Sequence, residues 1–312
     1  MPYRVSTRKP LRSLAIGEAL LATLIWASSF ILAQYGKGQI SPFTLAGIRY
    51  LLAGLIMLPF LFYGEQSIVR LPAKVLWRLF WIGLFAHALG NGAFFLAFKY
   101  LSATTSTFIS CFLPVPILLI GIIQLGEIPT LVQLIGLVVT LAGSALFFSP
   151  RMSNTEWIGL LIAIFGIFAF AYSTILSRAV AREQQASTFA LTALPLVFGG
   201  LPLLGSALAW EGLPTLTPLI WVIIFALAVI NTVVAYLLYN HAMQVLTAFE
   251  VNIFLNLAPF GTAVLAWYLF GDQLSIAQIV GMVIVIVGIT LVQWQPRTAS
   301  MRSENITANA TN

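Results

Sequence analysis

Long apolar stretches separated by short polar connectors make up most of the chain. A helix needs about 20 mostly apolar residues to cross a bilayer, and ten stretches meet that requirement. They are continuously apolar rather than alternating, which favours helices over the strands of a β-barrel. The seventh stretch, with two prolines and two adjacent glycines, is the least regular. The predicted spans are 16–34, 41–63, 79–98, 104–125, 131–149, 157–176, 187–209, 219–242, 249–270 and 275–294.

The chain also repeats itself at a distance of 145 residues, which carries segment 97–146 onto 242–291 without a gap. Each half holds five spans, an odd number, so the two copies cross the membrane in opposite directions. Inverted repeats are typical of secondary transporters. The sequence therefore predicts an all-α integral membrane protein of ten transmembrane helices, arranged as two inverted five-helix repeats. The identical pairs are Ala97 and Ala242, Leu101 and Leu246, Ala103 and Ala248, Pro114 and Pro259, Gly126 and Gly271, Gln133 and Gln278, Gly136 and Gly281, Gly143 and Gly288, and Leu146 and Leu291.

The composition supports a lipid environment and argues against an enzyme. Hydrophobic residues make up 60% of the chain, charged residues only 8%, and the mean hydropathy is +0.99, too little polar surface for a soluble globule of this size. Two histidines and one cysteine, Cys111, form neither a catalytic triad nor a zinc site, and no phosphate-binding loop is present. We expect no metal, no cofactor and no catalytic residues.

The net charge of +6 comes from residues in connectors rather than on one face, which does not suggest a nucleic-acid partner. Basic residues mark cytoplasmic connectors, so their asymmetry places both termini in the cytoplasm. We expect a cytoplasmic tail over 1–15, a first domain over 16–149, an external linker over 150–156, a second domain over 157–294 and a cytoplasmic tail over 295–312. One side carries Arg4, Arg8, Lys9, Arg12, Arg70, Lys74, Arg78, Arg178, Arg182, Arg297 and Arg302, and the other Lys37, Lys99 and Arg151.

An ordered set of motifs in both halves resembles the EamA family of the drug/metabolite transporter superfamily. The resemblance implies a ten-helix carrier of two EamA domains that exports amino acids, other metabolites or drugs across the bacterial inner membrane. Two departures are Asp272, where the family commonly has Glu, and the lack of a second-half counterpart of Pro42 and Arg49. The motifs are Trp26-Ala27-Ser28-Ser29-Phe30, Ser41-Pro42 with Arg49, 97–103, Pro114, Gly126-Glu127, Gly136 and Gly143, then 246–248, Pro259, Gly271-Asp272, Gly281 and Gly288.

Polar side chains within the predicted spans are candidates for a substrate cavity, because lipid does not solvate them. Arg49 matches the family's helix-two arginine; it could attract a substrate carboxylate or extend to the membrane surface. His87 and Asn91, four residues apart, share a helix face. This histidine could bind substrate or carry a coupling proton, or it could be a neutral core residue bonded to Asn91 or to a neighbouring carbonyl.

The ninth span carries Asn252 and Asn256 on one face, followed by Pro259, and Pro114 is its counterpart in the fourth span. Freed carbonyls near these prolines could line a cavity, or the prolines could only curve their helices. Glu250, at the start of the ninth span, could accept a coupling proton or could simply be hydrated. Glu127 and Asp272 follow glycines at the ends of equivalent helices, where we expect them to cap the next helix through its N-terminal amides or to gate.

Aromatic residues are expected to form the cavity wall, with Trp26 and Ser29 on the first helix, Tyr172 on the sixth and Tyr236 on the eighth. Trp and Tyr also form belts at membrane surfaces, which is the alternative. We therefore predict a secondary active transporter for a small molecule, with a proton as a candidate coupling ion. A channel or a lipid-translocating protein is the alternative function, and the sequence leaves a monomer and a dimer equally open.

Overall fold

A computed structural model describes residues 9–35, 38–62, 71–149, 156–271 and 273–294, and all regular structure in these residues is helical. Nine described segments are long and apolar enough to cross a membrane by length and composition. The first helix, α1, has 24 residues, which at about 1.5 Å per residue also suffices. The chain therefore follows the ten predicted spans. Several predictions fall on residues outside the described ones: Asp272, most of the linker, residues 1–8 of the first tail and the whole second tail. The same holds for seven of the basic residues used for topology: Arg4, Arg8, Lys37, Arg70, Arg151, Arg297 and Arg302.

The helices of the first half, residues 9–149, are α1 (Arg12–Tyr35), α2 (Pro42–Met57) with a 3-10 turn (Leu58–Leu61), α3 (Ala73–Gly83) with the π-helical η3 (Leu84–Asn91) and α4 (Gly92–Ala97), α5 (Ala103–Ser110), α6 (Pro114–Leu125) and α7 (Leu131–Phe148). Those of the second half, residues 156–294, are α8 (Trp157–Arg182), α9 (Thr188–Glu211), α10 (Pro218–Ala228) with the π-helical η4 (Val229–Val234) and α11 (Ala235–Ala242), α12 (Ala248–Leu255), α13 (Ala258–Phe270) and α14 (Ile276–Gln293).

The bounds of these elements recur at the offset of 145 residues found in the sequence. The bounds of α7 map onto those of α14, and the π-helical stretches begin at the equivalent residues Leu84 and Val229. Helices α6 and α13 both end at a left-handed glycine, Gly126 with φ +65° and Gly271 with φ +74°. Irregular backbone thus occurs at equivalent places in the two halves.

The expectation that the seventh span is the least regular is wrong. Helix α9 is continuous, with Pro195 and Pro202 inside it. It packs along α2 and α3, and Gly199 lies so close to Gly83 that an added Cβ would be 2.1 Å from the Gly83 carbonyl oxygen. Neighbouring helices stabilise a proline-containing helix within a membrane, and here that packing keeps α9 intact.

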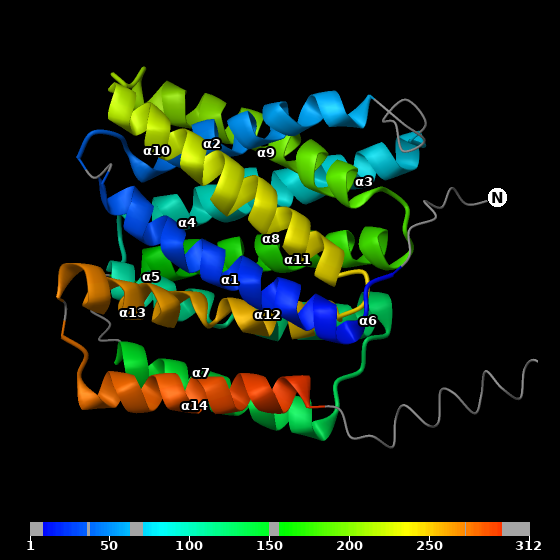
Figure 1. Ribbon diagram of the computed structural model, residues 1–312, viewed down its shortest axis with the longest axis vertical. Coiled ribbons are helices and arrows are strands. Elements are labelled where there is room, and N and C mark those ends of the chain that lie inside the picture. Colours follow the sequence, from blue (N-terminus) through cyan, green and yellow to red (C-terminus); the bar gives the residue numbers. More distant parts are fainter. Residues whose placement is uncertain (1–8, 36–37, 63–70, 150–155, 272, 295–312) are drawn as a thin grey trace, which may run out of the picture.

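Helices α7 and α14 lie side by side at one end of the molecule's longest axis, and α2, α9 and α10 lie at the other (Figure 1). Glycines in α7 and α14 make the contact between these two helices possible. A Cβ added at Gly136 would lie 2.6 Å from the carbonyl oxygen of Gly288, and one at Gly143 would lie 2.8 Å from that of Gly281. Small residues let membrane helices approach closely enough for backbone contact, so these glycines set the distance between α7 and α14.

The two ends of the helical bundle differ. We call the end where α1 begins and α8 ends the basic end, because Arg12, Arg178 and Arg182 lie there. At this end α6 packs against α12, whereas the equivalent pair at the opposite end, α5 and α13, makes few contacts. The bundle is therefore more tightly closed at the basic end.

Replacing Gly136 by Ala is expected to lower the apparent Tm of the purified protein in detergent. The added methyl group would overlap the backbone of α14, and such overpacking typically costs about 1–3 kcal/mol. Gly205→Ala is the matched control, because nothing lies within 4 Å of a Cβ at Gly205, and its Tm should stay level or rise. Equal Tm values for the two variants would contradict the close contact.

Candidate functional site

A polar cluster at the centre of the bundle joins the two halves around Arg49. The Arg49 guanidinium donates from Nε to Thr232 Oγ1 at 2.6 Å and from Nη2 to the Asn231 carbonyl at 2.8 Å. Both acceptors belong to η4 in the second half, and π-helical turns of this kind are frequent at functional sites. None of the described carboxylates forms an ion pair with Arg49. Arg49 therefore points into the protein, and the described groups that contact its positive charge are neutral.

Asn231 holds this cluster together. Its carbonyl oxygen accepts from Arg49 and also from Trp26 Nε1 at 3.0 Å. Its side-chain amide donates to Ser28 Oγ at 3.0 Å and to the Ile25 carbonyl. Asn231 is fully buried, and its Oδ1 has no partner among the described residues. It fixes α1 against η4 and so orients the backbone carbonyl that Arg49 binds.

Aromatic rings surround the cluster. Trp26 contacts Tyr236 and Tyr239 edge to face, with ring centroids 5.2 and 5.4 Å apart. Tyr236 also lies 5.5 Å from the ring of His87. These rings come from α1, α11 and η3, so they line the contact between the first and second halves. Their faces and edges suit an amphipathic small molecule.

His87 lies in the same aromatic group. Within the described part of the chain, it lacks the hydrogen bond to Asn91 or to a neighbouring carbonyl that the alternative of a neutral core histidine requires. Its ring is 4.6 Å from that of Tyr50, and the guanidinium carbon of Arg49 lies 5.4 Å from the same tyrosine ring. His87 is 2% exposed, and its Nδ1 has no partner among the described residues. Asn91 instead accepts from Tyr50 Oη at 3.5 Å and donates to the Ala86 carbonyl at 3.2 Å. A buried imidazole nitrogen thus remains available beside Arg49.

The structure places other predicted site residues away from this cluster. Ser29 donates to the Trp26 carbonyl within α1 at 2.6 Å, and Tyr172 packs on Phe85, with centroids 5.0 Å apart. Asn256 donates to the Cys111 carbonyl at 3.1 Å. The predicted cavity residues that meet in one place are therefore Trp26, Arg49, His87, Asn91 and Tyr236.

Asn252 connects the cluster to the rest of the fold. Asn252 donates to Tyr239 Oη at 2.9 Å and to the Ala248 carbonyl at 2.9 Å, so it joins α12 to the aromatic group.

Pro114 is the first residue of α6 and Pro259 the second of α13. Each follows a break in its span, where a proline needs no intrahelical partner.

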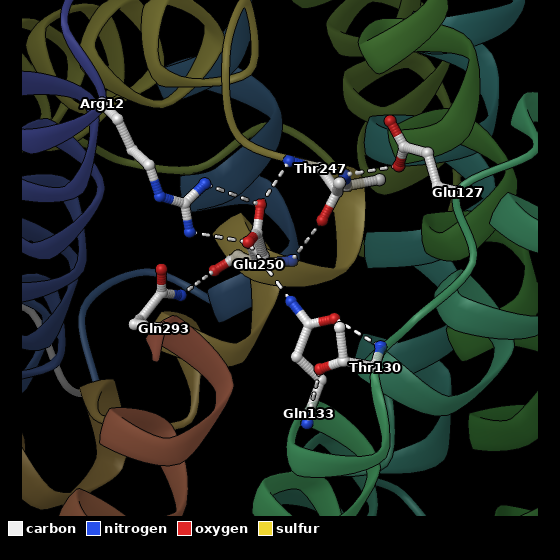
Figure 2. Close-up of polar contacts among 8 residues, drawn as sticks. Arg12, Glu127, Thr130, Gln133, Thr247, Glu250 and Gln293 are labelled. Atoms are coloured by element: carbon white, nitrogen blue, oxygen red, sulfur yellow. Dashed lines mark hydrogen bonds and ion pairs between the residues drawn. The ribbon is translucent and has the colours of Figure 1, made fainter. Parts of the chain in front are cut away.

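A second polar cluster lies at the basic end around Glu250, whose side chain is 2% exposed (Figure 2). Its carboxylate accepts from Arg12 Nη2 at 2.7 Å, from Gln133 Nε2 at 3.3 Å and from the Thr247 backbone N–H at 2.9 Å. The Glu250 carbonyl accepts from Gln293 Nε2 at 2.9 Å. Glu250 is therefore buried and bonded to α1, α7 and α14 rather than freely hydrated.

Glu127 lies beside this cluster. Its carboxylate accepts from Arg178 Nε at 2.8 Å and from the Ala248 backbone N–H at 3.1 Å. It therefore caps α12 in the other half, whereas the adjacent α7 is capped by Thr130 and Gln133. Arg178 also donates to the Met243 carbonyl. A carboxylate at a helix N-terminus is stabilised by the helix dipole as well as by its hydrogen bond.

Some residues of both clusters are missing from the sequence-based predictions. Asn231 and Tyr50 were not among the candidates, although a polar residue in the middle of an apolar run, as at Asn231 beside Thr232, is a usable signal. Arg12 and Arg178 served only as topology markers. Their roles depend on which helix ends meet, and one span in isolation does not reveal that.

The sequence model of the EamA-like transporter family matches residues 13–149 and 157–294. The chain belongs to this family. It is therefore a multi-pass membrane transporter with a small-molecule substrate, and the family members are transporters rather than enzymes. The predicted resemblance to EamA carriers is confirmed.

Individual EamA relatives cover most of the chain. An S-adenosylmethionine/S-adenosylhomocysteine transporter of Chlamydia trachomatis serovar L2 is 27% identical and aligns over 86% of both chains. The uncharacterized transporter YyaM of Bacillus subtilis is 26% identical over 86% of this chain and 89% of its own. A protein of known crystal structure superposes with a TM-score of 0.78 at 18% identity, covering 91% of this chain and 98% of that one; this likeness concerns the fold.

Asn231→Ala is expected to destabilise the carrier, because it removes the amide that joins η4 to α1. The acceptors it leaves are inside the membrane, and losing a buried hydrogen bond costs about 1–3 kcal/mol. The readout is the apparent Tm in detergent. Ser206→Ala is the control, since Ser206 bonds only within its own helix. A Tm equal to that of the control would show that Asn231 does not hold α1 and η4 together.

Proposed function

We propose that the protein is a secondary carrier that works by alternating access, with one substrate site around Arg49 between two inverted repeats. The recurrence of helix bounds, π-helical stretches and left-handed glycines at an offset of 145 residues supports the repeat. The reciprocal contacts of Gly136 with Gly288 and of Gly143 with Gly281 also support it, because the offset converts one pair into the other. Two similar halves of opposite orientation can exchange inward-open and outward-open shapes.

The observation that carries the proposal is the charge of Arg49 inside the membrane. A charged group there is costly unless it is paired or lines a watery cavity, and the described residues around Arg49 offer a hydroxyl, a carbonyl and the Tyr50 ring but no carboxylate. A substrate carboxylate would supply the missing negative charge through a two-pronged contact. The unpartnered Nδ1 of His87 offers a further polar contact nearby.

This site suits an amino acid or a similar small metabolite. A carboxylate would bind Arg49 while an apolar or aromatic part contacts Trp26 and Tyr236. The two compounds named for the Chlamydia trachomatis relative both contain an α-amino carboxylate group, which agrees with such a site. Ser29, Tyr172, Asn252 and Asn256, also predicted for the cavity, have a supporting rather than a direct role in this proposal.

We place the carrier in a bacterial inner membrane with the basic end in the cytoplasm, following the rule for basic residues, and infer that it exports its substrate. The helices at that end carry five described basic residues, Arg12, Lys74, Arg78, Arg178 and Arg182. At the other end lies Lys99. His87 and Glu250 are the candidates for a coupling proton. Pro114 and Pro259 are the proposed hinges.

We expect the protein, reconstituted in proteoliposomes, to exchange external radiolabelled substrate for the same unlabelled compound inside. The candidate substrates are S-adenosylhomocysteine and a panel of amino acids, and the exchange rate should saturate with external substrate concentration. Arg49→Gln should lower the initial exchange rate at least tenfold, because it removes the charge. Arg49→Lys should retain part of the rate, since it keeps the charge but loses the two-pronged contact. Lys99→Gln, a neutralisation at the opposite end, should leave the rate unchanged.

Flux that neither saturates nor accelerates with internal substrate would contradict the carrier and favour a channel. Unchanged exchange by a folded Arg49→Gln variant would instead remove Arg49 from the site and leave the carrier proposal intact.

A further inference from the structure

The polar contacts at the basic end form a reciprocal clamp between the two halves. We define the carboxylate clamp as Arg12, Glu127, Gln133, Arg178 and Glu250, with the backbone N–H of Ala248. Figure 2 shows Arg12, Glu127, Gln133 and Glu250. Among the described residues, Glu127 of the first half binds Arg178, Arg182 and Ala248 of the second half. Glu250 of the second half binds Arg12 and Gln133 of the first. Each carboxylate therefore crosses the boundary at which a carrier of two moving halves would open.

The clamp is buried except at Arg12, whose side chain is 29% exposed, and this burial makes its rupture costly. The side chains of Arg178 and Glu127 are 7% and 10% exposed, and that of Glu250 is 2% exposed. Separating a buried ion pair leaves each charge without its partner until water reaches it. The Ala248 N–H and the Met243 carbonyl would lose their partners in the same movement. Opening the basic end therefore has to replace several charge-assisted hydrogen bonds at once.

At the opposite end, the residues equivalent to three of the clamp residues are uncharged. The offset of 145 residues pairs Glu250 with Thr105, Arg12 with Trp157 and Arg178 with Ala33. Two clamp side chains have a similar residue at the equivalent position: Gln133 corresponds to Gln278 and Glu127 to Asp272. A movement that opened the basic end and closed the opposite one would therefore break buried ion pairs that the residues equivalent to Glu250, Arg12 and Arg178 could not re-form.

We propose that the carboxylate clamp biases the substrate-free carrier toward the form that is closed at the basic end and accessible from the opposite end. This inference rests on the proposed function, because it requires two interchanging halves. A bias of this kind means that substrate must bind more tightly to the other form if it is to open the basic end, since a ligand shifts an equilibrium only by its differential affinity. The clamp thus sets the population from which each transport cycle starts.

Two cysteine reporters at equivalent positions measure the bias in full-length protein in lipid nanodiscs, on a background in which the single native cysteine is removed by Cys111→Ala. Gly121→Cys reports the basic end, because Gly121 is buried in α6 and its added Cβ would lie 3.5 Å from Ile175 of α8, an ordinary contact. Ala266→Cys, its counterpart in α13, is half-buried. The readout is the labelling rate with a membrane-impermeant maleimide.

In the parent, the Gly121→Cys reporter should label slowly and the Ala266→Cys reporter faster. Adding Glu127→Gln or Glu250→Gln should raise the rate at Gly121→Cys at least fivefold and lower the rate at Ala266→Cys. Glu183→Gln is the matched control, because Glu183 is an exposed acid at the same end whose side chain bonds Gln185 of its own half. It should leave both rates unchanged.

Unchanged labelling at Gly121→Cys in folded, monodisperse Glu127→Gln and Glu250→Gln variants would overturn the inference. An equal rise in the Glu183→Gln control would also overturn it, because the effect would then be general loosening. A rise at Gly121→Cys without a fall at Ala266→Cys would show a clamp in a protein whose halves do not interchange, and would count against the proposed carrier instead.

A gain of function tests the same idea without altering the clamp itself. Thr105→Glu with Trp157→Arg places the missing acid and base at the opposite end. Thr105 is the third residue after the N-cap Ser102, whose hydroxyl accepts its N–H at 3.0 Å, so glutamate there completes a capping box. This double variant should raise labelling at Gly121→Cys. Folded protein with the parent rate would contradict the proposed bias.

Discussion

A guanidinium in the middle of a membrane has to be satisfied by the protein or by what the protein binds. Around Arg49 the protein supplies a hydroxyl and a backbone carbonyl, and both come from the other half of the chain. Asn231 orients that carbonyl through its own bonds to α1. Because these contacts cross between the halves, the group that we propose to bind a substrate anion also depends on the relative position of the halves. Arg49 is therefore suited to couple binding to movement.

The central cluster and the carboxylate clamp are connected through α12. Tyr239 contacts Trp26 by its ring and accepts from Asn252 by its hydroxyl. Asn252 lies on α12, whose first turn carries Glu250 and whose first N–H is capped by Glu127. A displacement of the aromatic group on substrate binding has a direct path to the helix that closes the basic end. We regard α12 as the element that both clusters control.

Hydrophobic runs predicted the spans because a bilayer requires long apolar helices whatever their tertiary contacts. The glycines at seven-residue spacing indicate close helix contact for an equally local reason, but the sequence does not show that α7 and α14 are the partners. The sequence did not predict the continuity of α9, which depends on packing against α2 and α3, or the π-helical stretches of η3 and η4. It also did not show which polar residues meet. Asn256 and Tyr172 looked as suitable as His87, and only the arrangement of helices separates them.

The central claim is that the two ends of the protein open in turn. Pulsed electron paramagnetic resonance measures it directly, with one spin-label pair joining the halves across the basic end and a second pair across the opposite end. Recording both distances in the parent and in the Glu127→Gln, Glu250→Gln variant tests for reciprocal change. We predict that the basic-end distance lengthens while the opposite-end distance shortens. Lengthening at both ends together, or no change at either, would contradict alternating access.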